Sequence, residues 1–251
     1  MKKIKRFLLL VLTAISAGCN PKPPYSIVFC DFSSSIDTIK TSEKIKTDAM
    51  QIFRNEVMDN CIDFYSISKD YHSRRLFRSE PLRSDHTPSE KEEFEARLGS
   101  RGDSLRKILD EASEESLKIY PNEPNSCIIN CIERSVSYFE MYEPERNTPL
   151  HLYILSDMLE CCVFTNNKKI NLEPNHDIEE QISSIPAITD SSLSLKQFKN
   201  LRIHVVVSSN KILEGKNKAF EKFWTLVFQR YGYDIRNQIT VELPRNFKDQ
   251  K

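Results

Sequence analysis

The chain has 251 residues, in which 36 Lys and Arg balance 36 Asp and Glu, with seven Cys and only five Gly. This length fits a single domain of ordinary to large size. The formal net charge of zero argues against a nucleic-acid-binding protein that depends on a broad basic surface. Neither GxGxxG nor GxxxxGK[ST] occurs in the sequence, so we expect no nucleotide bound through a glycine-rich phosphate loop.

The first 18 residues have the composition of an export signal. A basic stretch over 2–6 precedes a short apolar run over 7–15, and small residues over 16–18 lead to Cys19. The apolar run is short for a helix that spans a membrane. This arrangement resembles a bacterial lipoprotein signal, which implies that Cys19 becomes the lipidated first residue of the mature chain. An ordinary secretory signal and an uncleaved anchor remain alternatives.

Removal of residues 1–18 would take away four basic residues and no acidic one, and would leave a mature chain of net charge −4. Residues 19–24 carry three Pro and predict a short extended tether. No later apolar run approaches the length of a membrane span. We therefore expect a protein of the bacterial cell envelope, lipid-anchored on the periplasmic or surface face of a membrane, since two acyl chains give stable attachment.

Beyond the tether, strand and helix patterns alternate. The apolar run YSIVFC over 25–30 predicts a buried strand, and apolar residues at helical spacing predict a helix over roughly 42–58. The alternating stretch over 61–68 predicts a second strand. The segment 72–82 is expected to return beside it as an edge strand.

The middle of the chain is expected to be helical. Thr87, Pro88 and Glu90 occupy the N-cap, N1 and N3 positions of a helix start, and a helical stripe continues over 105–112. A Pro- and Asn-rich break over 120–125 separates this region from an amphipathic helix predicted over 128–139.

The last third of the chain repeats the alternation. Apolar runs predict strands over 150–155, 202–207 and 238–243, and an aromatic stripe predicts a core-facing helix over 220–231. The polar stretch 163–200 has little periodicity and is expected to form an elaborated loop with one short helix.

Strands that alternate with helices predict an α/β fold: a doubly wound, mostly parallel, Rossmann-like sheet flanked by helices on both faces. We assign this domain to residues 25–243, followed by a C-terminal tail over 244–251.

Six Cys follow Cys19, namely Cys30, Cys61, Cys127, Cys131, Cys161 and Cys162. An even number in an exported chain permits disulfides, but the sequence does not choose among the pairings. Neither a C-x₂-C pair nor the Cys and His spacing of a zinc finger occurs. Buried thiols or disulfides are therefore expected in place of a zinc site.

Polar side chains stand where two apolar strands end. Asp31, Ser33 and Ser35 follow the strand over 25–30, and Asp157 follows the strand over 150–155. In open α/β sheets, ligands bind beyond the carboxyl ends of the strands. Carboxylate and hydroxyl oxygens suit Mg²⁺ or Mn²⁺. The alternative is that the serines cap the next helix and the aspartates are turn residues.

The pattern Asp-x-Ser-x-Ser after an apolar strand resembles the metal-ion-dependent adhesion site of von Willebrand factor type A (vWA) domains. Those domains add a Thr from a loop before a helix, where Ser126 aligns, and an Asp at the end of a later central strand, where Asp157 aligns. The residue after that Asp is often Gly in the family and is Met158 here. The resemblance covers roughly 25–243.

The resemblance implies a binding module. Asp31, Ser33, Ser35, Ser126 and Asp157 would hold Mg²⁺, or Mn²⁺ or Ca²⁺, and a carboxylate of a protein partner would complete the coordination. No reaction and no nucleotide are implied.

Two alternatives remain open. Haloacid-dehalogenase-like phosphatases also place an Asp after the first strand and use Mg²⁺, but they need a second Asp two residues later, where this chain has Ser33. The other alternative is a vWA-like scaffold whose metal site is degenerate.

Overall fold

The computed structural model describes residues 22–33, 38–67, 74–82, 88–119, 126–142, 144, 147–159, 161–163, 169–172, 178–190, 192–207, 218–234 and 239–240. The expected signal over 1–18, Cys19 and the tail over 244–251 lie outside these residues.

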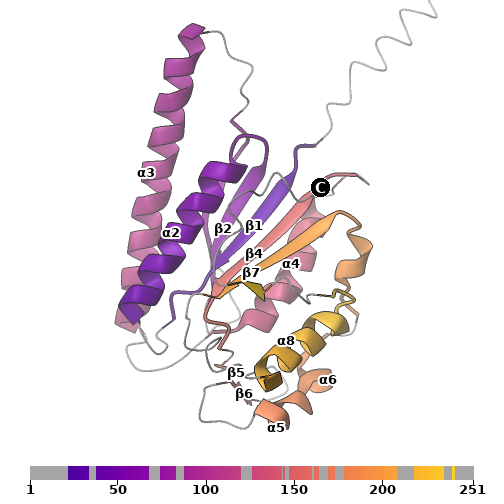
Figure 1. Ribbon diagram of the computed structural model, residues 1–251. Helices are drawn as coiled ribbons and strands as arrows, with labels where there is room; N and C mark the ends of the chain where they lie inside the picture. Colours follow the sequence, from indigo (N-terminus) through magenta and orange to yellow (C-terminus); the bar gives the residue numbers. More distant parts are fainter. Residues whose placement is uncertain are drawn as a thin grey trace, which may run out of the picture.

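Within the described part, six strands form one sheet in the order β3-β2-β1-β4-β7-β8 (Figure 1). Their bounds are β1 Tyr25–Cys30, β2 Cys61–Ser66, β3 Arg75–Ser79, β4 Leu150–Ser156, β7 Leu201–Val207 and β8 Ile239–Thr240. All neighbouring pairs are parallel except β2 and β3, which are antiparallel. The predicted doubly wound, mostly parallel sheet is therefore confirmed, including its returning edge strand.

The two central strands are apolar because both of their faces are covered. Along β1, Ile27 and Phe29 belong to one buried cluster, and Val28 and Cys30 belong to the other. This division follows from the alternation of side chains along a strand. A strand buried on both faces reads as a continuous apolar run, which is why the sequence pattern of β1 was informative.

Helices cover both faces of the sheet (Figure 1). On one face lie α2 (Thr38–Glu56) and α3 (Pro88–Ile119). On the other lie α4 (Ile128–Tyr142) and α8 (Lys218–Arg230), whose apolar stripes join the cluster that contains Phe29. The two helical patterns expected between Thr87 and residue 112 form the single helix α3, which continues through Gly99 and Gly102.

The region expected to be an elaborated loop has more structure than the sequence indicated. It contains β6 (Lys169–Asn171), which forms a hairpin with β5 (Cys161–Val163) at its start, the short helices α5 (Ile178–Ile182) and α6 (Ile185–Ile188), and a 3₁₀ turn at Leu195–Gln197. Each segment is too short to display a period, and is held by one or two buried residues such as Ile170 and Leu195.

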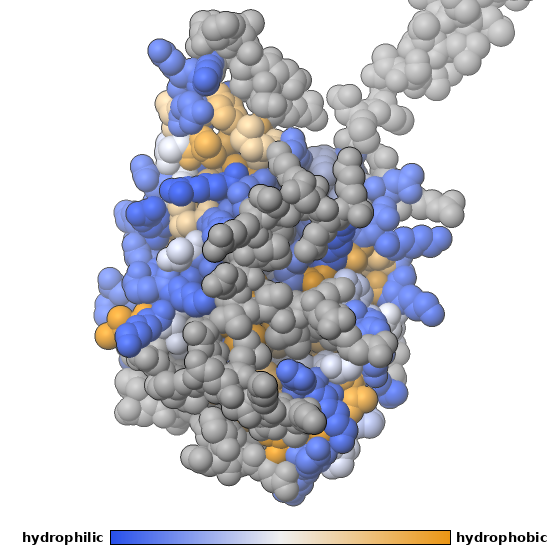
Figure 2. All heavy atoms as spheres, in the orientation of Figure 1, coloured by the Kyte–Doolittle hydropathy of each residue, from blue (hydrophilic) through white to orange (hydrophobic). Residues whose placement is uncertain are grey.

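Hydrophilic residues dominate the described atoms on the face shown in Figure 2. Ile39 and Met141 are the exposed large hydrophobic residues within the described ranges. No helix among the residues searched is long and apolar enough to cross a membrane.

The strand order also locates the place where a ligand would bind. Chain connections leave β1 and β4 toward opposite edges of the sheet, so the order reverses between these two neighbours. Doubly wound sheets bind ligands at such a switch point, beyond the carboxyl ends of the strands. Asp31 and Asp157 follow β1 and β4 at this edge.

Candidate metal centre

Asp31 is the centre of a hydrogen-bonded cluster at the carboxyl end of β1. Its backbone N–H donates to the carbonyl oxygen of Leu155 in β4 (2.9 Å), which continues the strand pairing by one residue. Its Oδ2 accepts from the hydroxyls of Ser126 (2.7 Å) and Ser156 (2.6 Å). Its Oδ1 accepts from the backbone N–H of Ser33 (3.0 Å). The residue is only 3% exposed, so these contacts hold the carboxylate in one orientation.

The hydroxyls of Ser33 and Ser126 lie 2.6 Å apart, although the residues are separated by 93 positions. Ser126 has one hydroxyl proton and donates it to Asp31, so Ser33 is the donor between the two serines. Ser126 stands just ahead of α4 and is buried. The described beginning of the DxSxS turn, residues 31–33, therefore contacts the residue ahead of α4.

Asp157 follows β4 in a turn that is fixed by its own side chains. Asp157 Oδ1 accepts from the N–H of Leu159 (3.0 Å), and Ser156 Oγ accepts from the N–H of Met158 (2.8 Å). Met158 has φ of 62°, a left-handed conformation that favours glycine. The Trp224 indole donates to its carbonyl oxygen (3.1 Å). Met158 thus stands where vWA domains often have Gly, and it adopts a backbone conformation that Gly favours.

Two acidic groups are buried together at this edge. Burial and then the neighbouring Asp31 carboxylate raise the pKa of Asp157 to about 8, and Asp157 is 4% exposed. The ion pairs within the described ranges lie elsewhere and involve neither aspartate. Burial of like charges without a counterion is costly, and a bound cation would remove that cost.

The donor set determines which cation these residues would fit. Among the described residues, no group of three or more His, Cys, Asp or Glu side chains is placed to hold a metal. The cluster instead offers two carboxylates and several hydroxyls. Mg²⁺ is commonly held by one or two carboxylates and keeps other positions for water or a ligand, so the residues present fit Mg²⁺ better than an ion that needs an all-protein cage.

The structure thus brings Asp31, Ser33 and Ser126 into direct contact and places Asp157 on the adjacent strand. Ser35 lies outside the described residues. Ser156 is a member of the cluster that the sequence analysis missed. It could be found only from the register between β1 and β4, which pairs Cys30 with Leu155 and so brings the next residues, Asp31 and Ser156, together.

One disulfide occurs within the described ranges, between Cys127 and Cys162. Cys30, Cys61 and Cys131 are buried thiols. The pairing that the sequence left open therefore includes a bond that starts directly after Ser126.

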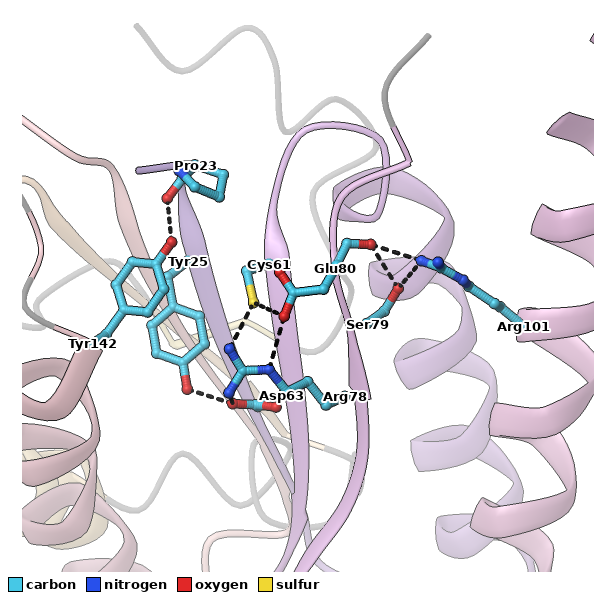
Figure 3. A network of polar contacts seen from close by, with 9 residues as sticks. All are labelled: Pro23, Tyr25, Cys61, Asp63, Arg78, Ser79, Glu80, Arg101 and Tyr142. Atoms are coloured by element: carbon cyan, nitrogen blue, oxygen red, sulfur yellow. Dashed lines mark hydrogen bonds and ion pairs between the residues drawn. The ribbon is translucent and has the colours of Figure 1, made fainter. Parts of the chain in front are cut away.

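A second polar cluster lies at the opposite end of β1 and β2 (Figure 3). The Tyr25 hydroxyl donates to Asp63 Oδ2 (2.6 Å), and the Arg78 guanidinium lies 3.7 Å from the same oxygen. Arg78 also pairs with Glu80 (3.1 Å). Burial raises the pKa of Asp63, against the lowering effect of Tyr25 and Arg78. The nearby cation compensates the charge of Asp63, so this cluster has a structural role.

No family model matches the chain, and no curated protein sequence matches it. A solved structure described as von Willebrand factor type A from Catenulispora acidiphila is similar over 84% of this chain and 43% of its own, with 9% identity and a TM-score of 0.37. The human COPII-coat protein Sec24c is similar over 89% of this chain and 30% of its own, with 10% identity and a TM-score of 0.44. The chain thus spans less than half the length of either protein.

The features of the chain itself agree with the resemblance in fold. The first strand runs into the Asp-x-Ser turn, and a later central strand beside it ends at Asp157. The chain has a vWA-like fold.

Proposed function

We propose that this chain is an exported binding module that holds a divalent cation, with Mg²⁺ favoured over Mn²⁺ or Ca²⁺, and binds an acidic group of a protein partner through it. The proposed ligands, direct or through water, are Asp31, Ser33, Ser35, Ser126 and Asp157. One observation carries the proposal: the contacts of Asp31 with Ser33, Ser126 and Ser156 form beside a second buried carboxylate at the switch point of the sheet.

The protein's own residues prepare this site before any ligand arrives. Asp31 accepts the protons of Ser126 and Ser156, which fixes the rotamers of both hydroxyls and directs their remaining lone pairs away from the carboxylate. Burial keeps competing water from these groups. A bound divalent cation would supply a positive centre with an open coordination position. Because hydroxyl ligands are neutral, such a centre keeps an attraction for a carboxylate of the partner.

Nothing in the cluster favours the phosphatase alternative. The residue two positions after Asp31 is Ser33, whose hydroxyl donates to Ser126, and a serine there does not supply the carboxylic acid that the reaction needs. A degenerate vWA-like scaffold remains the outcome expected if no cation binds.

Calorimetric titration of the full chain with Mg²⁺ tests the proposal. We expect saturable binding by the wild type and at least a tenfold loss in Asp31→Asn, since one charged ligand is removed without a change of shape. Asp110→Asn is the control, because Asp110 is a half-exposed carboxylate on α3 that pairs with Lys46. Equal Mg²⁺ affinity of Asp31→Asn and wild type would overturn the proposed site.

Two further measurements separate the classes of function. An acidic peptide should bind the wild type with Mg²⁺ and lose binding with EDTA. Turnover of an aryl phosphate that requires Mg²⁺ and Asp31 would instead establish the phosphatase.

A further inference from the structure

The two segments that form the far side of the candidate site are joined covalently. Ser126 is followed directly by Cys127, and Cys127 is bonded to Cys162, 35 positions away. Cys162 belongs to β5, which begins four residues after Asp157. The disulfide therefore connects the residue directly after Ser126 to the strand that follows Asp157 in the chain.

The surroundings of the bond restrict its movement. Cys127 is 1% exposed and Cys162 is 2% exposed, and both belong to the core cluster that α4 and α8 share with the sheet. On the Asp157 side, the Trp224 indole N–H donates a hydrogen bond to the carbonyl oxygen of Met158. On the Ser126 side, α4 begins at Ile128, so the disulfide fixes the start of this helix at the residue next to the ligand.

Without this bond, only non-covalent contacts would keep Ser126 in place. In the described residues, its hydroxyl donates to Asp31 and accepts from Ser33, and both contacts depend on the position of the loop. Groups that orient metal ligands typically change metal affinity by roughly 10- to 100-fold when they are removed.

We infer that the Cys127–Cys162 disulfide is a positioning element of the cation site, so that the chain binds Mg²⁺ tightly only in its oxidised form. This inference rests on the proposed function of the same site. Mg²⁺ binding would then depend on the redox state of the compartment. Reduction by a dithiol breaks the S–S bond and adds two electrons and two protons to give two thiols, while the dithiol is converted to its own disulfide. Thiol reductants of this kind prevail in the cytosol, whereas exported proteins meet oxidising surroundings.

The test compares Mg²⁺ affinity of the full chain in four forms: oxidised wild type, wild type refolded with excess dithiothreitol, Cys127→Ala/Cys162→Ala, and Cys131→Ala. Thiol titration verifies the redox state, and circular dichroism verifies the fold. Cys131→Ala is the matched control, because Cys131 is a buried thiol one turn further along α4. We expect the oxidised wild type and Cys131→Ala to bind alike, and the other two forms to bind at least tenfold more weakly.

Circular dichroism of the reduced wild type distinguishes positioning from a general loss of stability, because positioning predicts a folded protein with weaker Mg²⁺ binding, and re-oxidation then tests whether the bond itself is responsible. Re-oxidation should restore full affinity to the reduced wild type and leave the double variant weak. Equal affinity of oxidised and reduced wild type would overturn the inference while the proposed function stands. Failure of the oxidised wild type to bind Mg²⁺ would overturn the proposed function itself. Should the double variant not fold, the oxidised and reduced forms of the wild type decide the question by themselves.

Discussion

Asp157 occupies a position where a neutral side chain would make the cation-free protein more stable. Its carboxyl is buried next to Asp31, and both the burial and the neighbouring charge raise its pKa to about 8. The proton is therefore bound more tightly in the folded state than in the unfolded state. The resulting cost to stability is present near neutral pH and disappears as the pH falls toward the unfolded-state pKa.

We predict that Asp157→Asn raises the free energy of unfolding by about 1–2 kcal/mol near pH 7 in EDTA, because an amide does not have to take up a proton on folding and can still accept from the Leu159 N–H. The same variant should lose the increase in the free energy of unfolding that we expect Mg²⁺ to give the wild type. Urea unfolding with and without Mg²⁺ measures both effects. If Asp157→Asn were less stable than the wild type in EDTA, the Asp157 carboxyl group would have to stabilise the cation-free fold through a contact within the protein, which would contradict its role as a cation ligand.

Tyr25 makes a different kind of contact with a buried acid. Its hydroxyl donates to Asp63 Oδ2, and Asp63 is fully enclosed. We predict that Tyr25→Phe lowers the free energy of unfolding by about 1–3 kcal/mol, because a buried carboxylate loses a donor. Tyr142→Phe is the comparison: that ring stacks on Tyr25 at 4.3 Å, but its hydroxyl donates to the carbonyl oxygen of Pro23 in a half-buried setting. If urea unfolding gave equal decreases in the free energy of unfolding for Tyr25→Phe and Tyr142→Phe, the stabilisation could not be assigned to the hydrogen bond with Asp63.

At the scale of the elements, the sequence predicted most where a segment is long and buried on both sides. The strands β1, β4 and β7 were found as apolar runs, and α8 was found by its aromatic stripe. The hairpin of β5 and β6 has three residues per strand, which is too short for alternation to be visible. Its place depends on tertiary packing and on the Cys127–Cys162 bond, which local patterns do not encode.

The candidate site was predictable where its residues directly follow such buried strands. Asp31, Ser33 and Asp157 follow recognisable strands, so the topology of a parallel sheet brings them to one edge. Ser156 lies within a strand end and required the register between β1 and β4. The left-handed conformation of Met158 was not predicted, because Gly adopts this conformation readily and the residue here is Met.

A stack of rings on β4 and β7 makes the pH dependence of stability predictable. Tyr153 lies opposite His204 in the strand register, and their ring centroids are 4.7 Å apart. His151 stacks at 5.9 Å from His204. Burial, then His151 and Arg202, lowers the pKa of His204 to about 4. From α2, the Glu56 carboxylate faces the stack and bonds to the Tyr153 hydroxyl.

Because the folded-state pKa of His204 lies below the unfolded value of about 6.5, its contribution to stability is complete above that value and is lost as the pH falls toward 4. We predict that the free energy of unfolding drops by about 1–2 kcal/mol between pH 7 and pH 5 from this residue. His204→Phe should flatten that part of the curve, measured by urea unfolding at each pH. Parallel curves for the variant and the wild type would contradict the assignment to His204.

For the molecule as a whole, the tether and the candidate site lie at opposite ends of β1. Lys22 donates to the carbonyl oxygen of Tyr142 (2.9 Å), the Tyr142 hydroxyl donates to that of Pro23 (2.7 Å), and the Cys61 N–H donates to that of Pro24 (2.9 Å). These bonds fix the described end of the tether to the amino edge of the sheet. Six residues of strand, at roughly 3.3 Å each, place Asp31 about 20 Å away.

This separation leads to a prediction about Cys19, the proposed site of lipidation. In the full chain expressed in a bacterial host, Cys19→Ala should move the protein from the membrane fraction to the aqueous fraction, because the acyl chains would supply the attachment. Labelling with a fatty-acid analogue should mark the wild type alone. The Mg²⁺ affinity of the variant should equal that of the wild type, since the candidate site lies at the opposite edge of the sheet from the tether.

Two outcomes would contradict this prediction. Retention of Cys19→Ala in the membrane would identify residues 1–18 as an uncleaved anchor. A change in Mg²⁺ affinity would show that the tether end of the domain affects the candidate site.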